Sequence, residues 1–192
     1  MNRQMGEPEF YCLFDTAIGT CGVAWSAQGL TRLQLPEASC DATERRLRRG
    51  GAVAADAPLV VVRAIAELQR YFKGEAADFS QIALDLRGVD AFERRVYDAA
   101  RLIGWGKTLS YGELARRIGD PTAARAVGQA LGRNPIPVIV PCHRILAAGH
   151  RIGGFSAPGG ADTKQRLLAL EGVYAAETPL LPGLFPARRE SA

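Results

Sequence analysis

The chain has 192 residues, of which 47% are apolar and 23% are charged, and its formal net charge is +4. This length suits one or two compact domains with real cores, and the sequence contains neither an apolar run that could cross a membrane nor a secretory signal at its start. The four cysteines form no C-x-x-C pair and the chain has only two histidines, so a disulfide framework and a local zinc site lose support and a cytoplasmic protein is expected.

Short strands followed by one helix are predicted for the first part of the chain. Residues 10–15, 21–25 and 30–35 read as strands of a small antiparallel sheet. Asp56-Ala57-Pro58 begins a helix that ends at Gly74 and should cover one sheet face. Its predicted inward residues are Leu59, Val62, Ile65, Leu68 and Phe72. Residues 82–86 alternate as another strand, and 87–89 resemble a link between domains.

Helical patterns fill the second part of the chain. Asp90 is predicted to cap a helix, with Glu93 completing a capping box and with Phe92, Val96, Ala99 and Ile103 on its inner face. Ser110 and Glu113 form a second capping-box pair, for a short helix that ends at Gly119. A further helix over 121–133 follows a tight turn. The two short helices are a helix-turn-helix candidate, although most such pairs bind no DNA.

Basic charge is concentrated around this helix pair. Residues 101–166 carry ten Lys or Arg against three Asp or Glu, a net charge of +7, whereas residues 1–89 have a net charge of −1. A polyanion is a natural partner for such a segment, and an ordinary solvated surface is the alternative. The 121–133 helix is rich in Ala and Gly, and Arg125 protrudes from it. It could enter a narrow groove or pack closely against a neighbouring helix.

A Cys-His pair follows a proline-rich stretch. Pro135, Pro137 and Pro141 forbid a helix and predict an extended path that holds Cys142 rigidly. A thiolate is the nucleophilic form of cysteine, and an imidazole backed by a carboxylate can remove the thiol proton. Glu171 is one candidate carboxylate. A buried structural cysteine beside a surface histidine is an equally good interpretation of the same residues.

The segment Ser110–Arg144, SYGELARRIGDPTAARAVGQALGRNPIPVIVPCHR, closely resembles the O6-alkylguanine-DNA alkyltransferases, also called methylated-DNA-protein-cysteine methyltransferases. The hallmark is IVPCHR at Ile139–Arg144, and the likeness extends over roughly residues 90–173. It implies an α/β N-terminal domain over 1–87, with a small antiparallel, ribonuclease-H-like sheet and a helix. It also implies an all-α C-terminal domain with a helix-turn-helix over 90–174, followed by a C-terminal tail over 175–192.

The resemblance implies DNA repair by direct damage reversal. The protein would flip O6-alkylguanine out of duplex DNA through the minor groove and transfer the alkyl group irreversibly, once per molecule, to Cys142. His143 would act as base through a water, Glu171 would orient the imidazole, and Asn134 would brace the turn. Arg144 is expected to serve packing and backbone contacts.

Further residues are implied to contact DNA or the flipped base. Arg125 would fill the vacated space in the duplex, and the Tyr111 hydroxyl would bond the guanine ring. The backbone N–H of Ser156 would donate to the guanine oxygen, and the carbonyls of Cys142 and Ile145 would accept from the exocyclic amine. Gly128 is among the small helix residues that would fit the minor groove.

No cofactor and no metal are expected, and residues 1–89 contain no histidine. The expected partner is double-stranded DNA containing O6-alkylguanine, bound by a monomer of a bacterial, nucleoid-associated protein, with cooperative binding left open. Three other functions compete with this interpretation. A cysteine hydrolase would share the chemistry but has no use for Arg125, a transcription regulator would not explain the PCHR motif, and a DNA-binding relative without transfer activity would lack Cys142.

Overall fold

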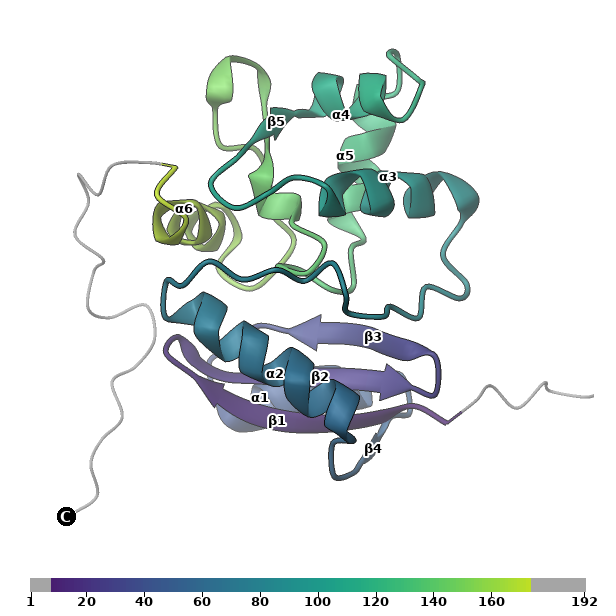
Figure 1. Cartoon of the computed structure of the whole chain (residues 1–192), viewed down its shortest axis with the longest axis vertical. Helices are drawn as coiled ribbons and strands as arrows, with labels where there is room; N and C mark the ends of the chain where they lie inside the picture. The colour runs from purple at the N-terminus through teal and green to yellow at the C-terminus, as the bar shows by residue number, and fades with distance from the viewer. Residues whose placement is uncertain (1–7, 174–192) are drawn as a thin grey trace, which may run out of the picture.

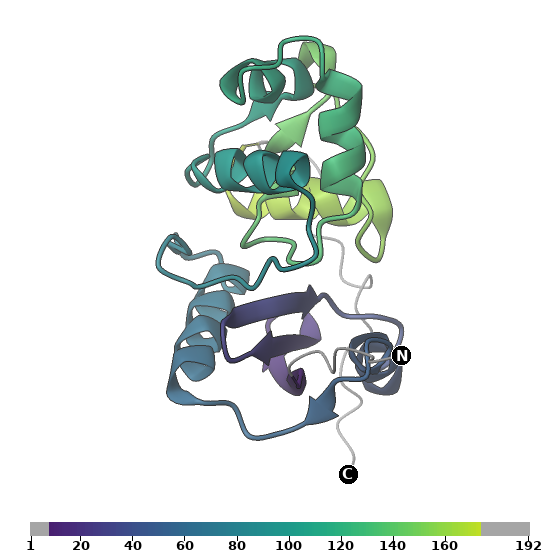
Figure 2. The ribbon, with the colours of Figure 1, turned by 90° about the vertical axis from the view of Figure 1, so that its right-hand side faces the viewer.

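A computed structural model describes residues 8–173 as two units stacked along the long axis of the molecule (Figure 2). We call residues 8–89 the sheet unit and residues 90–173 the helical unit. Within this part of the chain no helix is long and apolar enough to span a bilayer. The tail predicted from Ala175 onward lies outside the described residues.

Three antiparallel strands form the centre of the sheet unit. They are β1 (Phe10–Thr16), β2 (Gly19–Ser26) and β3 (Gly29–Gln34), so the predicted strands are confirmed. The prediction of a purely antiparallel sheet is wrong, because β4 (Val53–Ala54) pairs in parallel with β1 and gives the order β3-β2-β1-β4. A strand of two residues is too short for side-chain alternation to reveal it.

Two helices cover opposite faces of this sheet (Figure 1). One of them, α1 (Cys40–Arg48), was not predicted, because its many arginines obscure a short amphipathic pattern. The Ser39 hydroxyl caps this helix by accepting from Ala42 N at 3.2 Å, and Leu47 is fully buried. The helix predicted over the other face is α2 (Leu59–Phe72). It begins after Pro58 without a side-chain cap, so the predicted start at Asp56 is wrong.

The predicted inner face of α2 is also partly wrong. Leu59 and Val62 are 67% and 46% exposed. The residues that α2 buries are Val61, Ala64, Leu68, Tyr71 and Phe72. Leu68 and Phe72 belong to both faces, so the buried stripe is rotated by less than the angle of about 100° that separates successive helix positions. This rotation brings Tyr71 into the interior.

Residues 82–86 do not form the predicted strand. They run beside β3 and make one isolated parallel bridge, between Leu30 and Leu84, with Asp85 N donating to Leu30 O at 2.8 Å. Leu86 is the buried member of the alternating set. The segment therefore extends the sheet edge without a regular ladder and leads directly to the helical unit.

The helical unit contains α3 (Ala91–Arg101), α4 (Tyr111–Arg117), α5 (Ala124–Gly132) and α6 (Gly160–Leu170), with single turns η1 (Cys142–Arg144) and η2 (Ala148–His150). The all-α prediction is wrong in one detail, because β5 (Leu109–Ser110) pairs in parallel with β6 (Ile145–Leu146). This short ladder fixes the start of α4 beside η1.

The two predicted capping boxes differ in outcome. Asp90 caps α3 by accepting from Glu93 N at 2.8 Å, but the Glu93 carboxylate bonds Arg133 instead of turning back. The box at α4 is complete: Glu113 N donates to Ser110 Oγ at 3.2 Å, and Ser110 N donates to Glu113 Oε2 at 2.6 Å.

We expect Ser110→Ala to lower the free energy of unfolding by about 1 kcal/mol, because the N-cap hydroxyl and one half of the box are lost together. Urea denaturation at neutral pH measures this change. Threonine at the same position retains a capping hydroxyl, so Ser110→Thr should recover most of the loss. Equal stability of the alanine variant and the parent protein would contradict the role of the cap.

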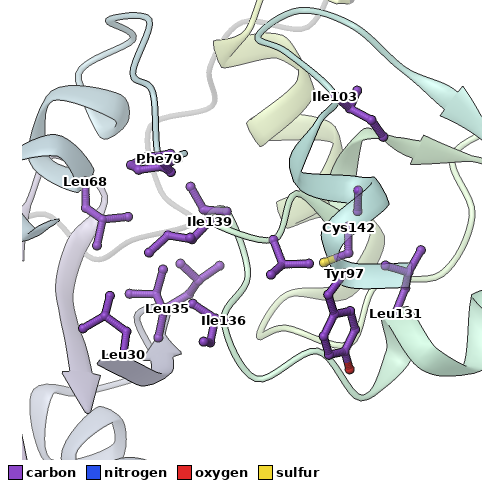
Figure 3. Close-up of a cluster of buried hydrophobic side chains, with 14 of the residues drawn as sticks. Leu30, Leu35, Leu68, Phe79, Tyr97, Ile103, Leu131, Ile136, Ile139 and Cys142 are labelled. Carbon is purple, nitrogen blue, oxygen red and sulfur yellow. The ribbon is translucent and has the colours of Figure 1, made fainter. Parts of the chain in front are cut away.

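One hydrophobic core runs through both units. In Figure 3 the sheet-unit side chains of Leu30, Leu35 and Leu68 face Ile136 and Ile139 of the helical unit. The cluster continues from there to Cys142. A backbone hydrogen bond from Leu33 N to Pro135 O, 3.0 Å long, crosses the same boundary. The segment that carries the Cys-His pair is therefore packed directly against the sheet unit.

Candidate active site

The segment before Cys142 is a tight turn and not the extended path that the prolines suggested. Val140 N donates to Ile136 O at 2.9 Å, and Val138 has φ = 74°. A β-branched residue in the left-handed region is strained, at a cost of about 1–3 kcal/mol, and persists only where its surroundings enforce it. Here Val138 is 1% exposed, so burial of its side chain offsets that cost.

Asn134 braces this turn from within. Its Oδ1 accepts from Ile136 N at 2.9 Å, and its Nδ2 donates to Val140 O at 2.8 Å. The second hydrogen of the amide points to the thiol, with Nδ2 3.2 Å from Cys142 Sγ. Asn134 therefore holds both the backbone of the turn and the sulfur of Cys142, whereas the sequence predicted only that it braces the turn.

The Cys142 thiol is buried but lies at the surface of a pocket. It is 6% exposed. Burial raises its pKa, whereas the hydrogen bond from Asn134 and the positive charge of Lys164 lower it, and the net pKa is above the ordinary value. The resting sulfur is consequently a protonated thiol at neutral pH, and a base is needed to make it nucleophilic.

His143 and Glu171 form a fully buried pair. His143 Nε2 lies 2.7 Å from Glu171 Oε1, so this nitrogen carries the hydrogen. Burial lowers the pKa of His143 while the bonded carboxylate raises it, and the net shift is downward, which leaves a neutral imidazole. Nδ1 has no hydrogen-bond partner among residues 8–173 and is therefore a free acceptor. A surface histidine, the alternative interpretation of the sequence, is excluded.

Glu171 gathers donors from several segments. Arg144 donates from Nε to Oε2 at 2.8 Å and from Nη2 to Oε1 at 2.9 Å, and Gly106 N lies 3.2 Å from Oε2. The Tyr71 hydroxyl adds a bond of 2.8 Å to Oε1. Burial raises the pKa of Glu171, but the hydrogen bonds from His143 and Arg144 outweigh it and lower the pKa to about 2. The carboxylate is thus charged.

Three participants were missed or misjudged from the sequence. Arg144 does donate to a backbone carbonyl, that of Ile103, but it also forms the bidentate pair with Glu171 that packing alone does not suggest. Tyr71 was missed because the inner face of α2 was misplaced. Lys164, which was counted in the sequence only among the basic residues of 101–166, is fully buried and donates from Nζ to Ile145 O at 2.5 Å. Its neighbours in the sequence give no signal of this burial.

A pocket of about 360 Å³ opens beside the thiol. Its lining comes from α4, α5, η1 and the loop before α6: Tyr111, Gly128, Leu131, Gly132, Cys142, Gly154, Phe155 and Ser156. The glycine at 153 makes room for Tyr111, since a Cβ there would lie 3.2 Å from the hydroxyl, whereas a Cβ on Gly128 would lie 3.6 Å from Cε1, an ordinary van der Waals contact. Its volume lies in the range typical of small-molecule sites.

Two further predicted site residues, Ile145 and Arg125, do not line this pocket. Ile145 follows η1, and its carbonyl accepts from Lys164, whose Nζ lies 5.7 Å from the Tyr111 ring centroid. Arg125 is exposed on α5. α5 buries Val127 and Leu131 in the core, so the close-packing interpretation of its small residues holds for one face, while Arg125 stays in solvent.

Metal binding finds no support in the described part of the chain, where no three His, Cys, Asp or Glu side chains gather closely enough to hold an ion. The chemistry available is that of a buried thiol, a neutral imidazole with a free nitrogen, and a charged carboxylate. We call Cys142, His143 and Glu171 the buried triad. It can form a thiolate and hold the released proton on the imidazole.

Two family models match consecutive parts of the sequence. The ribonuclease-like domain of 6-O-methylguanine DNA methyltransferase matches residues 10–86, and the DNA binding domain of the same enzyme matches residues 91–173. The first covers the sheet unit and the second the helical unit that contains the buried triad.

Curated relatives and solved structures agree with these matches. The chain is 44% identical over 161 residues to the methylated-DNA--protein-cysteine methyltransferase of Mycolicibacterium paratuberculosis, covering 84% of this chain and 91% of that protein. It is 37% identical to the protein of the same name from Sulfolobus acidocaldarius, covering 85% and 93%. The crystal structure of Mycobacterium tuberculosis OGT in complex with DNA superimposes with a TM-score of 0.71 at 39% identity, covering 84% and 92%.

Proposed function

Because the chain belongs to the 6-O-methylguanine DNA methyltransferase family, we propose that Cys142 is the residue that receives the alkyl group. The protein is a DNA repair enzyme that transfers alkyl groups from methylated DNA to a protein cysteine. The observation that carries the assignment is the geometry of the thiol. It faces a pocket large enough for a nucleobase, and the next residue in the chain is a buried histidine whose Nδ1 has no partner among the described residues.

The buried triad supports a displacement reaction. His143 Nδ1 takes the thiol proton through a bridging water, with Glu171 holding Nε2–H and stabilising the imidazolium. The Cys142 sulfur then attacks the alkyl carbon, the bond from that carbon to guanine O6 breaks, and its electron pair goes to the guanine. The proton held on His143 balances the new charge. A thioether has no hydrolysis step, so each molecule acts once.

The pocket supplies groups for the leaving guanine. We propose that the Tyr111 hydroxyl bonds a ring nitrogen and that the Ser156 N–H donates to O6, where negative charge develops. The carbonyls of Cys142 and Ile145 accept from the exocyclic amine. Since a carbonyl oxygen has two lone pairs, the Ile145 carbonyl can serve the amine while it still binds Lys164.

DNA is the partner, and we propose that α4 and α5 act as a helix-turn-helix in the minor groove of duplex DNA containing O6-alkylguanine. The basic charge of residues 101–166 supports contact with phosphates. The glycine at 128 lets the helix surface stay smooth. We also propose a monomer, action at the nucleoid in the cytoplasm, and a domain boundary at residues 88–89, which lies between the two family matches.

The decisive experiment mixes the purified protein with a duplex that carries one O6-methylguanine. Intact mass should rise by one methyl group per molecule, and peptide mapping should place that group on Cys142. An unchanged mass with tight binding of the lesion duplex would instead identify a lesion-recognition protein. Methylation of a different cysteine would overturn the assignment of the acceptor.

We expect Arg125→Ala to slow transfer from a duplex by about tenfold to a hundredfold, because extrusion of a stacked base costs a few kcal/mol and this side chain compensates part of it. Transfer from free O6-methylguanine should be unaffected, since no extrusion is needed. Arg63→Ala is the matched control, because Arg63 is another exposed arginine, on α2 of the sheet unit. Quenched single-turnover assays on both substrates measure the effect. Equal slowing of transfer from free O6-methylguanine would contradict a role of Arg125 in base extrusion.

A further inference from the structure

The buried triad lies in the helical unit, yet a hydroxyl from the sheet unit reaches it. Tyr71, in the last turn of α2, is fully buried, and its hydroxyl donates to Glu171 Oε1 at 2.8 Å. The hydroxyl oxygen of Tyr71 also lies 3.2 Å from His143 Nε2. Because Nε2 itself lies 2.7 Å from Oε1, the hydroxyl touches both members of the pair at once.

We propose that Tyr71 is a positioning residue for alkyl transfer, which orients the Glu171 carboxylate and keeps the hydrogen of His143 on Nε2. This leaves Nδ1 available for the proton of Cys142. The inference rests on the proposed function of His143 as the base. It assigns to the sheet unit a direct part in the chemistry of the helical unit.

The donors and acceptors of Tyr71, His143 and Glu171 determine the direction of each hydrogen bond among them. A tyrosine hydroxyl has one hydrogen, and the charged carboxylate of Glu171 accepts it. The hydroxyl lone pairs then face Nε2, and they would repel a nitrogen lone pair there. Both neighbours of Nε2 consequently favour the tautomer with hydrogen on this atom. Partners that fix the tautomer of a working histidine in this way strongly influence its reactivity.

Aromatic packing holds the Tyr71 ring in place. The ring centroid lies 5.2 Å from Phe72 and 5.3 Å from Trp105, both edge-to-face, and 5.7 Å from Phe79. Phenylalanine preserves all three contacts. Glu171 Oε1 also keeps its bonds from His143 and Arg144 when the hydroxyl is removed, so Tyr71→Phe leaves both Oε1 and His143 Nε2 with a partner.

The pH dependence of transfer should report this role. The titratable and charged groups that act on the His143 ring are Glu171 at the end of α6, Tyr71 from α2, Arg144 from η1 and Lys164 from α6. His143 is needed as a general base only while the Cys142 thiol is protonated. At high pH the thiolate forms without this help, and a rate loss caused by a misoriented imidazole should then shrink.

The test compares Tyr71→Phe with the matched control Tyr11→Phe in the full-length protein. Tyr11 is 3% exposed in the same unit, and its hydroxyl donates to Glu44 at 2.5 Å in a separate buried cluster. Single-turnover methyl transfer should be about tenfold slower for Tyr71→Phe at about pH 7, and this deficit should shrink as the pH rises and the thiol ionises without help. The affinity for lesion DNA and the rate of the control should be unchanged. A parent-like rate at neutral pH, or a deficit that is constant with pH, would overturn the proposal.

A second readout does not depend on methyl transfer. The chain has only two histidines, so ¹⁵N-histidine spectra are simple, and a His150→Gln variant assigns them. The Nε2–H proton of His143 should be visible in the parent protein and should exchange with water several-fold faster in Tyr71→Phe. An identical exchange rate in the two proteins would reject the role of Tyr71. If the spectra change as expected but the parent protein gains no methyl group, the proposed function fails and the positioning role stands.

Discussion

Cys142→Ser should abolish alkyl transfer while it leaves lesion-DNA binding within about twofold of the parent protein. A serine hydroxyl is far less acidic than a thiol, and a neutral imidazole cannot ionise it to a useful extent, so we expect a rate loss of at least about a thousandfold. Asn134 Nδ2, which lies 3.2 Å from the sulfur, can donate to the serine oxygen equally well. The turn and the pocket should therefore remain intact.

Intact mass and gel-shift measurements with an O6-methylguanine duplex check this expectation. Cys40→Ser is the control, because Cys40 is an exposed free thiol far in sequence from the buried triad, and it should react at the parent rate. A Cys142→Ser protein that still gained a methyl group on another cysteine would move the acceptor elsewhere. Loss of binding together with transfer would mean that the substitution disrupts the fold.

Glu171→Gln should destabilise the protein far more than Ser110→Ala does. The carboxylate is the counter-ion of the buried Arg144 guanidinium, and removing one partner of a buried ion pair costs about 3–5 kcal/mol because the other charge stays desolvated. Transfer should also slow by about a hundredfold or more, since His143 loses the acceptor for its Nε2–H. The exposed pair of Arg70 and Glu75 offers the control, and Glu75→Gln should cost less than about 1 kcal/mol.

The same carboxylate predicts the acid sensitivity of the fold. Its pKa is lowered from 4.5 to about 2 in the folded protein, so its contribution is fully present above pH 4.5 and is lost as the pH falls toward 2. The shift corresponds to about 3 kcal/mol. Chemical denaturation between about pH 6 and pH 2 should show this loss in the parent protein, and the Glu171→Gln variant should show a flatter profile. Parallel profiles for the two proteins would rule out Glu171 as the acid-sensitive group.

Much of this site could be predicted from local sequence. The IVPCHR segment identified Cys142, and capping signals placed the start of α4 and with it Tyr111. Those signals work because they depend on neighbours in the chain. The bond between Asn134 and the thiol spans only eight residues, and the resemblance implied a bracing role for this amide.

Contacts that cross the fold could not be predicted in this way. Tyr71 lies 100 residues from Glu171 in sequence, and the hydrophobic pattern of α2 allowed two overlapping inner faces, of which only one includes Tyr71. Only packing against the helical unit selects the face with Tyr71. In the same way, burial of Lys164 depends on a carbonyl of β6, and the parallel strand β4 depends on a partner 43 residues earlier.

The continuous core that joins the two units determines which molecule changes shape during repair. Ile136 and Ile139 pack the thiol-bearing turn against the sheet unit, so the core holds this turn in place. In the proposed base-flipping reaction, the reorganisation energy of the encounter then falls mainly on the nucleic acid, which would bend and release its base to a surface held by this core. The local deformability of the double helix, more than any motion of the enzyme, should decide how quickly each lesion is removed.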